Sequence, residues 1–201
     1  MAKKGLEVNI QPIKVADFKM KIGGISPLLM NKFSDAAKQG LLDKQAGKSS
    51  ERKKRTKEAI EREIEAKIHR MPNGAVGFPA AGFKKAMVEA ATGKLLDGMN
   101  GKLAKGSFFI IGNLVPVKYK KQKINEAIGR IGRNIPMVTF RPEFEDWSAE
   151  LPIKYNASQV TPQQIVALAN LAGFHIGVGD WRPQKSGSYG MFQVVGNGDK
   201  K

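Results

Sequence analysis

A glycine-rich stretch near the C-terminus, HIGVGDWRPQKSGSYGMFQV (175–194), combines residue types that could bind a phosphodiester chain. Glycine lets backbone N–H groups approach a phosphate closely, and Arg182 and Lys185 can supply positive charge. Trp181 or Tyr189 could stack on a nucleobase. The alternative is a tight connection whose glycines only satisfy backbone angles, with Trp181 buried in the core. We expect the glycines to shape the turn and the basic side chains to contact phosphate.

The same stretch begins like a dinucleotide-binding motif, but it lacks two features of that motif. The position of the third glycine holds Arg182. A Rossmann loop follows a strand and opens a helix, whereas this run follows a predicted helix and ends in the alternating strand MFQVV. We therefore expect no nucleotide or other cofactor.

Few side chains of the sequence could carry acid–base or metal chemistry. The absence of cysteine excludes disulfides, thiolate zinc sites and a cysteine nucleophile. Only two histidines, His69 and His175, are present, which excludes a histidine-rich metal site. Neither has an evident partner base and the carboxylates do not cluster, so we expect no metal ion and no intrinsic catalysis.

Charge is the outstanding feature of the composition. Thirty-four Lys and Arg against eighteen Asp and Glu give a formal net charge of +16 and a pI near 10.0. Such a chain repels itself unless a polyanion is nearby, which makes nucleic acid the leading partner class. A membrane surface is the rival, but the sequence offers no good amphipathic helix and no apolar run long enough to cross a bilayer. The N-terminal stretch does not have the pattern of a secretory signal, so the chain is expected in the cytoplasm.

The elements that would position these residues follow a β-α-β-β-α-β order. Alternating apolar residues predict strands at 6–26, 107–119 and 136–156, before the last strand MFQVV. Helical spacing predicts helices at 79–92 and 161–174, the second with Thr161 as its N-cap. The order is that of an α+β, ferredoxin-like (RRM-like) core, which covers one sheet face with two helices and leaves the other open. We expect a single domain over residues 1–201.

Two basic segments interrupt this order. Residues 44–70 hold ten Lys and Arg against five Glu, which predicts a charged helical insertion at about 34–70. Ser49 or Ser50 would cap its helix, and Glu63 and Lys67 would pair one turn apart. The apolar stripe is narrow, so the helix should hardly pack into a core. A solvated insertion and a binding arm remain alternatives, but the cluster 52–55 favours the arm because four adjacent cations are costly without anions.

The second basic segment is an excursion at about 118–135. Between Lys118 and Arg133, six basic residues stand against one acidic residue. It falls between the two central strands of the predicted core.

Three stretches together resemble the RAMP superfamily. KIGGISPLLMNKF (21–33) resembles its first strand and glycine-bearing loop, and GFPAAGFKKAMVEAA (77–91) resembles the opening of its first helix. GVGDWRPQKSGSYGMFQV (177–194) resembles its C-terminal glycine-rich loop before the last strand. Ala81 and Gly82 replace the usual Ser-dominated pair, and the third motif is more loosely spaced. The motifs occur in the expected order across nearly the whole chain.

Within that superfamily, the size of the chain is similar to that of the repeating backbone subunit of CRISPR effector complexes, which serve antiviral defence. The resemblance implies a non-catalytic subunit that grips single-stranded, guide-like RNA by its phosphates. It also implies partners, namely copies of the chain along the RNA and other effector subunits. The insertion at 34–70 would take the place of a finger-like element, and the excursion at 118–135 that of a thumb.

The predicted RNA contacts are basic, polar or aromatic side chains of the three motifs and the two basic segments. They are Lys21, Lys32, Arg52, Lys53, Lys54, Arg55, Lys84, Lys85, Lys118, Lys120, Lys121, Arg130, Arg133, Trp181, Arg182, Lys185, Ser186 and Tyr189.

Two other functions remain open. One is an RNA endonuclease of the same superfamily, whose members use an Asp after the first strand or a histidine near the first helix. Asp35, Asp43 and His69 lie in those regions. The other is a phage-type single-stranded DNA-binding or recombination protein that shares only the charge.

Overall fold

The core of the chain has the predicted order of elements, with two short strands in place of the one predicted at 107–119. The fold is described from a computed structural model covering residues 12–48, 56–131 and 135–196. Along the chain the core consists of β1 (Val15–Gly24), α3 (Ala80–Thr92), β5 (Phe108–Ile110) with β6 (Leu114–Lys118), β9 (Ser148–Asn156), α5 (Pro162–His175) and β10 (Phe192–Val194). In the sheet, β10 pairs with β1, β1 with β9, and β9 with both β5 and β6, always antiparallel. The α+β prediction is confirmed.

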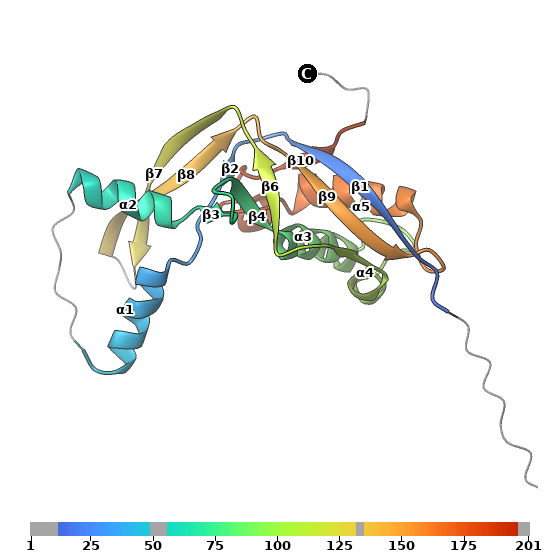
Figure 1. The fold of residues 1–201 in the computed structure, drawn as a ribbon, viewed down its shortest axis with the longest axis horizontal. Helices are drawn as coiled ribbons and strands as arrows, with labels where there is room; N and C mark the ends of the chain where they lie inside the picture. The colour runs from blue at the N-terminus through green and yellow to red at the C-terminus, as the bar shows by residue number, and fades with distance from the viewer. Residues whose placement is uncertain (1–11, 49–55, 132–134, 197–201) are drawn as a thin grey trace, which may run out of the picture.

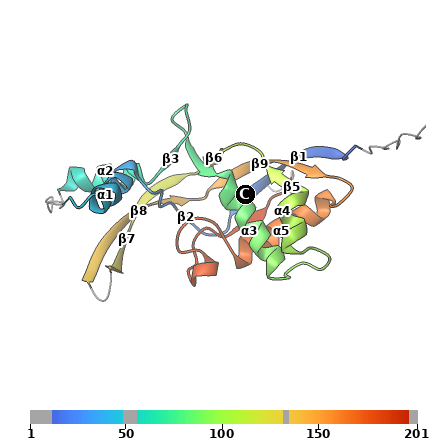
Figure 2. The same ribbon diagram turned by 90° about the horizontal axis from the view of Figure 1, so that it is seen from below.

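The helices of the core lie on one face of this sheet. Figure 2 shows α3, α4 (Gly101–Ser107) and α5 below the strands, while the opposite face carries no helix of the core. α5 begins as predicted, since Thr161 and Gln164 form a capping box and Pro162 is the first helical residue. Two short strands, β4 (Val76–Pro79) and β3 (His69–Arg70), extend the sheet beyond β6.

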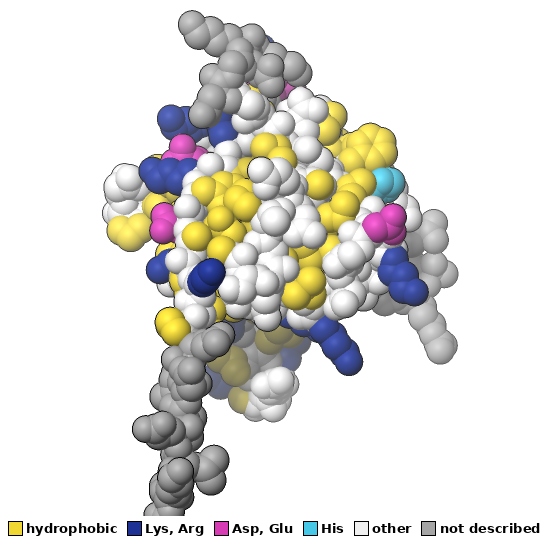
Figure 3. Space-filling model, turned by 90° about the vertical axis from the view of Figure 1, so that its right-hand side faces the viewer, with side chains coloured by type: hydrophobic (Ala, Val, Ile, Leu, Met, Phe, Trp, Pro, Cys, Tyr) yellow, Lys and Arg dark blue, Asp and Glu magenta, His cyan; other side chains and the backbone are white. Residues whose placement is uncertain are grey.

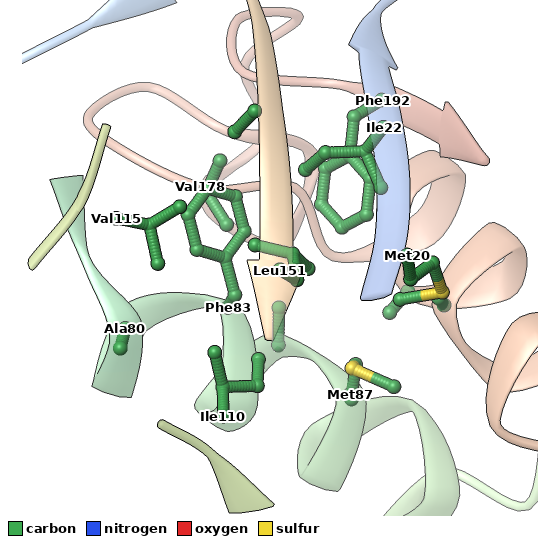
Figure 4. Close-up of a cluster of buried hydrophobic side chains, with 14 of the residues drawn as sticks. Met20, Ile22, Ala80, Phe83, Met87, Ile110, Val115, Leu151, Val178 and Phe192 are labelled. Carbon is green, nitrogen blue, oxygen red and sulfur yellow. The ribbon is translucent and has the colours of Figure 1, made fainter. Parts of the chain in front are cut away.

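A continuous apolar core fills the space between the sheet and the helices. Figure 4 shows Met20 and Ile22 of β1 and Leu151 of β9 facing Phe83 and Met87 of α3. All five side chains are buried. The alternation that predicted β1 and β9 therefore reflects burial against α3 and α5, which is the usual origin of a period of two.

The basic excursion is a long hairpin that belongs to a second sheet. β7 (Lys121–Ile131) pairs with β8 (Ile135–Glu145), and β8 pairs with β2 (Leu28–Leu29). Figure 1 shows this hairpin reaching away from the core helices. The hairpin is longer than the predicted 118–135, because the first part of the predicted strand 136–156 belongs to it. Alternation indicates a strand but not its partner, and the chain turns at Asp146 (φ +50°) before β9 begins.

The charged insertion holds two helices, α1 (Asp35–Gln45) and α2 (Lys57–Ala66). Thr56 caps α2, whereas the predicted caps Ser49 and Ser50 lie outside the described residues. The predicted pair is confirmed, with 2.8 Å between Lys67 Nζ and Glu63 Oε1. The prediction that the helix would hardly pack into a core agrees with the structure, because α2 buries one side chain, Ile64, which is not part of the main apolar core. Ile68, which follows the helix, does belong to that core. α2 lies against β8, as Figure 1 shows.

Within the described residues, no helix combines the length and apolar character that a membrane crossing requires.

Candidate nucleic-acid interface

The glycine-rich loop connects α5 to β10 and packs against the chain segment that follows β1. The N–H of Asp180 donates to the carbonyl of Leu29 at 3.0 Å, and the N–H of Gly190 donates to that of Pro27 at 2.8 Å. Gly179 and Gly190 adopt φ values of +80° and +67°. A Cβ on Gly179 would lie 2.4 Å from the Leu29 carbonyl oxygen, so only glycine permits this approach. The first and third motifs of the sequence thus meet in space.

Most backbone N–H groups of the loop already have partners within the chain. Val178 donates to Gly190, Gly187 to Arg182, and Tyr189 to Trp181, at 2.9 to 3.1 Å. The glycines therefore serve the fold, as one of the two interpretations of the sequence predicted. Contacts with a phosphodiester chain would fall mainly to the side chains of the loop.

The side chains of the loop differ in how far they face solvent. Lys185 and Ser186 are exposed, and Tyr189 is half-buried. Arg182 is also half-buried, because its guanidinium donates to the carbonyl of Gly179 at 3.1 Å and to Gln184 Oε1 at 2.8 Å. Arg182 therefore both braces the loop and carries charge at its surface. Lys185 is the freer of the two cations.

Trp181 does not plug the core. Its side chain is 50% exposed, and its backbone lies in the left-handed region at φ +50°. The guanidinium carbon of Arg141 lies 5.3 Å from the indole centroid, which places a cation over the ring. The aromatic side chain that fills the core instead is Trp147, which is 2% exposed and donates to the Ser26 carbonyl at 2.8 Å.

A polar network links the loop to the hairpin β7–β8. Arg141 of β8 is 4% exposed and donates to Asp180 Oδ2 at 2.9 Å and to Asn125 Oδ1 at 3.2 Å. Asn125 of β7 in turn donates to the Tyr189 hydroxyl at 3.2 Å, and Asn31 donates to Asp180 Oδ2 at 3.3 Å. Tyr189 is the one predicted RNA contact in this network, and its other members were not singled out from the sequence. One signal was available, since Arg141 stands in TFRPEF at an inward position of an alternating strand.

A pocket of about 310 Å³ lies between this loop and the first turns of α3. Its lining includes Lys85, Glu89, His69 and Arg182. Burial, together with the nearby charge of Lys32, lowers the pKa of His69. The imidazole is therefore neutral at pH 7, and the pocket presents Lys85 and Arg182 as its cations.

Two predicted contacts, Lys21 of β1 and Lys118 of β6, lie on the open face of the sheet. They line a groove of about 720 Å³ together with Lys19 and Glu150. Glu150 pairs with Lys19 at 3.3 Å. The structure therefore distributes the predicted contacts over two faces and does not gather them into one surface.

The remaining predicted contacts occupy varied positions. The ammonium group of Lys84 is turned inward, where the carbonyls of Ala104 and Phe108 accept its hydrogen bonds and the Phe108 ring lies 3.4 Å away. Burial lowers the pKa of Lys84 to about 8. Lys120 pairs with Asp146 at 3.5 Å, and Lys121 is exposed at the start of β7. Outside the described residues or side chains lie Arg52, Lys53, Lys54, Arg55, Arg130 and Arg133.

The candidate catalytic carboxylates lie on α1. Asp35 is exposed in its first turn, and Asp43 accepts a hydrogen bond from Gln39 and pairs with Lys48 at 3.7 Å. Among the residues that the structure describes, no three His, Cys, Asp or Glu side chains gather as they would to hold a metal ion.

The side of the molecule away from the hairpin has a different character. Figure 3 shows hydrophobic side chains gathered there, with Lys and Arg side chains scattered around them. The loop, the pocket beside α3 and the adjoining hairpin are therefore the better candidate interface, because they combine exposed cations with an exposed aromatic ring.

Comparison with known proteins supports the fold. No protein-family model matches the sequence, and no curated protein matches it either. A chain of the structure described as "Cryo-EM structure of the Type III-B Cmr-beta bound to cognate target RNA" is similar, with a TM-score of 0.58 and 13% identity. The match covers 91% of this chain and 60% of that chain, so this protein spans about three fifths of its length.

A second solved structure, "Crystal structure of Cmr6 from Pyrococcus furiosus", matches with a TM-score of 0.43 and 8% identity, covering 92% of this chain and 100% of that chain. The first match, at its level of identity, concerns the fold alone. The fold expected from the three motifs is therefore supported, while the resemblance to the RAMP superfamily stays a prediction from those motifs.

Proposed function

We propose that this protein is a non-catalytic, RNA-binding, backbone-type subunit of a CRISPR-like ribonucleoprotein. The observation that carries the proposal is the glycine-rich loop, which holds an exposed Trp181 beside Lys185 and Arg182 at the edge of a basic hairpin. The net charge of +16 supports a polyanionic partner. The fold likeness to a chain from an RNA-bound Type III-B complex makes RNA the first partner to test.

In this proposal the chain grips guide-like single-stranded RNA through its phosphates. The hairpin β7–β8 acts as the thumb, and α1 and α2 form the finger-like element. Further copies of the chain bind along the same RNA, and other effector subunits complete an assembly for antiviral defence in the cytoplasm.

The proposal is tested by the salt dependence of RNA binding. Lys85 and Lys185 are exposed, and Lys85 makes only a loose 3.8 Å pair with Glu89. Replacing both with alanine should therefore leave the fold intact but remove about two phosphate contacts. For a single strand, counterion release predicts that the slope of log K against log salt becomes shallower by about 1.4 units. Fluorescence anisotropy with labelled single-stranded RNA measures this slope.

The matched control is the double variant Lys102→Ala and Lys105→Ala on α4, which removes the same charge from exposed positions outside the loop and the pocket. It should leave the slope unchanged. If the two double variants had the same salt slope, the RNA would bind outside the glycine-rich loop and the pocket beside α3. Equal affinity for DNA of the same sequence would favour the single-stranded DNA-binding alternative.

An RNA endonuclease is the second candidate, because His69 lines the pocket with Lys85 and Arg182. Its lowered pKa leaves the imidazole free to accept a proton at pH 7. We expect purified protein to leave labelled RNA intact, since the carboxylates that line the same pocket are already paired, Glu89 with Lys85 and Asp180 with Arg141. Gel electrophoresis after incubation provides the measurement. Cleavage that His69→Ala abolishes without weakening RNA binding would establish the endonuclease and overturn the non-catalytic role.

A further inference from the structure

The loop holds Trp181 in a conformation that a bulky residue rarely adopts. Its φ of +50° is uncommon outside glycine, asparagine and aspartate. Two hydrogen bonds hold its backbone there: the Trp181 N–H donates to the side-chain Oδ1 of Asp180 at 3.1 Å, and the Trp181 carbonyl accepts from the Tyr189 N–H at 3.1 Å. Gly187 completes the arrangement, because a Cβ there would lie 1.8 Å from that carbonyl. Unfavourable backbone conformations that the surroundings enforce occur preferentially at functional sites.

Burial does not account for this arrangement, because half of the indole faces solvent. The side chain is instead fixed by Arg141, whose guanidinium lies over the ring at 5.3 Å. Arg141 is itself held by Asp180 and Asn125 and is 4% exposed. The ring therefore has a fixed position while part of its surface stays open, which is the geometry of a stacking platform.

The charges around the ring favour an anionic ligand. Lys185 is exposed on the same loop, and Arg182 is half-buried beside it. The nearby carboxylate, Asp180, is already bound by Arg141, Asn31 and the Trp181 N–H. A ligand that places an aromatic ring on Trp181 and a negative charge near Lys185 matches a nucleotide of a single strand.

We propose that Trp181 stacks on one unpaired nucleobase where an RNA strand passes over the exposed surface of the glycine-rich loop, beside the hairpin β7–β8. This inference rests on the proposed function for the phosphate contacts and adds a base contact to them. Stacking of this kind tolerates any base sequence, because every base has an aromatic face. The site therefore accepts a splayed or single-stranded nucleotide and excludes a base that is stacked within a duplex.

Intrinsic fluorescence offers a direct test. The chain contains two tryptophans, and the other, Trp147, is buried. The protein is titrated with a short oligouridylate and with an abasic oligomer of equal length and charge. We expect the oligouridylate to quench the emission and to bind about tenfold more tightly, the effect of one stacked base. The abasic oligomer should bind through its phosphates and leave the emission nearly unchanged.

The variant Trp181→Asn provides the control, since asparagine tolerates the left-handed conformation and should preserve the loop. It should bind both oligomers alike, with an unchanged melting temperature. A tenfold preference for oligouridylate that survives in Trp181→Asn would overturn the stacking proposal while leaving the proposed function intact. Equal quenching by the abasic oligomer would overturn it too. Failure of both oligomers to bind the wild-type protein would overturn the proposed function and this inference together.

Discussion

Replacing Asp180 with alanine should lower the free energy of unfolding by about 3 kcal/mol. The change leaves the guanidinium of Arg141, 4% exposed, without the carboxylate that lies 2.9 Å away. Removing one partner of a buried ion pair is strongly destabilising because the remaining charge stays buried without compensation. The same substitution also removes the acceptor of the Asn31 and Trp181 hydrogen bonds. Urea unfolding followed by circular dichroism measures the loss.

The reciprocal variant, Arg141→Met, should cost less. Methionine fills much of the same volume without charge, and the Asp180 side chain is 34% exposed, so water can solvate the carboxylate that remains. Nε of Arg141 has no hydrogen-bond partner, so its removal also relieves one buried unpaired group. The double variant Asp180→Ala with Arg141→Met should lose less unfolding free energy than the sum of the two single variants, since their interaction can be lost only once. If Arg141→Met lost more unfolding free energy than Asp180→Ala, the uncompensated charge of Arg141 would not be the main cause of the destabilisation.

The elements of the core could be predicted because their signals are local. Thr161, Pro162 and the apolar face of 161–174 specify α5 within a few residues, and the structure confirms that helix. The order β-α-β-β-α-β follows from such local signals alone. The pairing of residues 136–145 with β7 could not be predicted from local signals, because an alternating sequence looks the same whichever strand it pairs with.

The candidate site was only partly predictable for a related reason. Charge and glycine content identified the loop, but Arg141 and Asp180 stand 39 residues apart and meet only through the fold. Lys84 and Lys85 are adjacent and look equivalent in sequence. One turns inward to backbone carbonyls of α4 and β5, while the other faces solvent. The carbonyls that bind Lys84 lie 20 and 24 residues away, beyond the reach of helical periodicity.

The glycine-rich loop makes the second strong prediction, because Gly190 has no room for a side chain. Its φ is +67°, and a Cβ would lie 1.7 Å from the carbonyl oxygen of Val178. That oxygen belongs to the backbone, so rotating a side chain cannot relieve the clash. Moving the backbone would strain the hydrogen bond that the Val178 N–H donates to the Gly190 carbonyl at 2.9 Å. We expect Gly190→Ala to cost at least about 3 kcal/mol, the left-handed conformation alone accounting for about 1 to 2 kcal/mol.

Gly74 supplies the matched control for backbone conformation. It has a φ of +82° and no atom within 4 Å of its ideal Cβ position. Gly74→Ala should therefore cost only the conformational part, and thermal melts should fall by roughly 3 °C for Gly74→Ala and by roughly 10 °C for Gly190→Ala in a chain of this size. Similar melting temperatures for the two variants would show that the loop can shift away from Pro27 and Leu29. In that event the loop could not hold Trp181 in a fixed position, and both the network with Arg141 and the stacking platform would lose their structural basis.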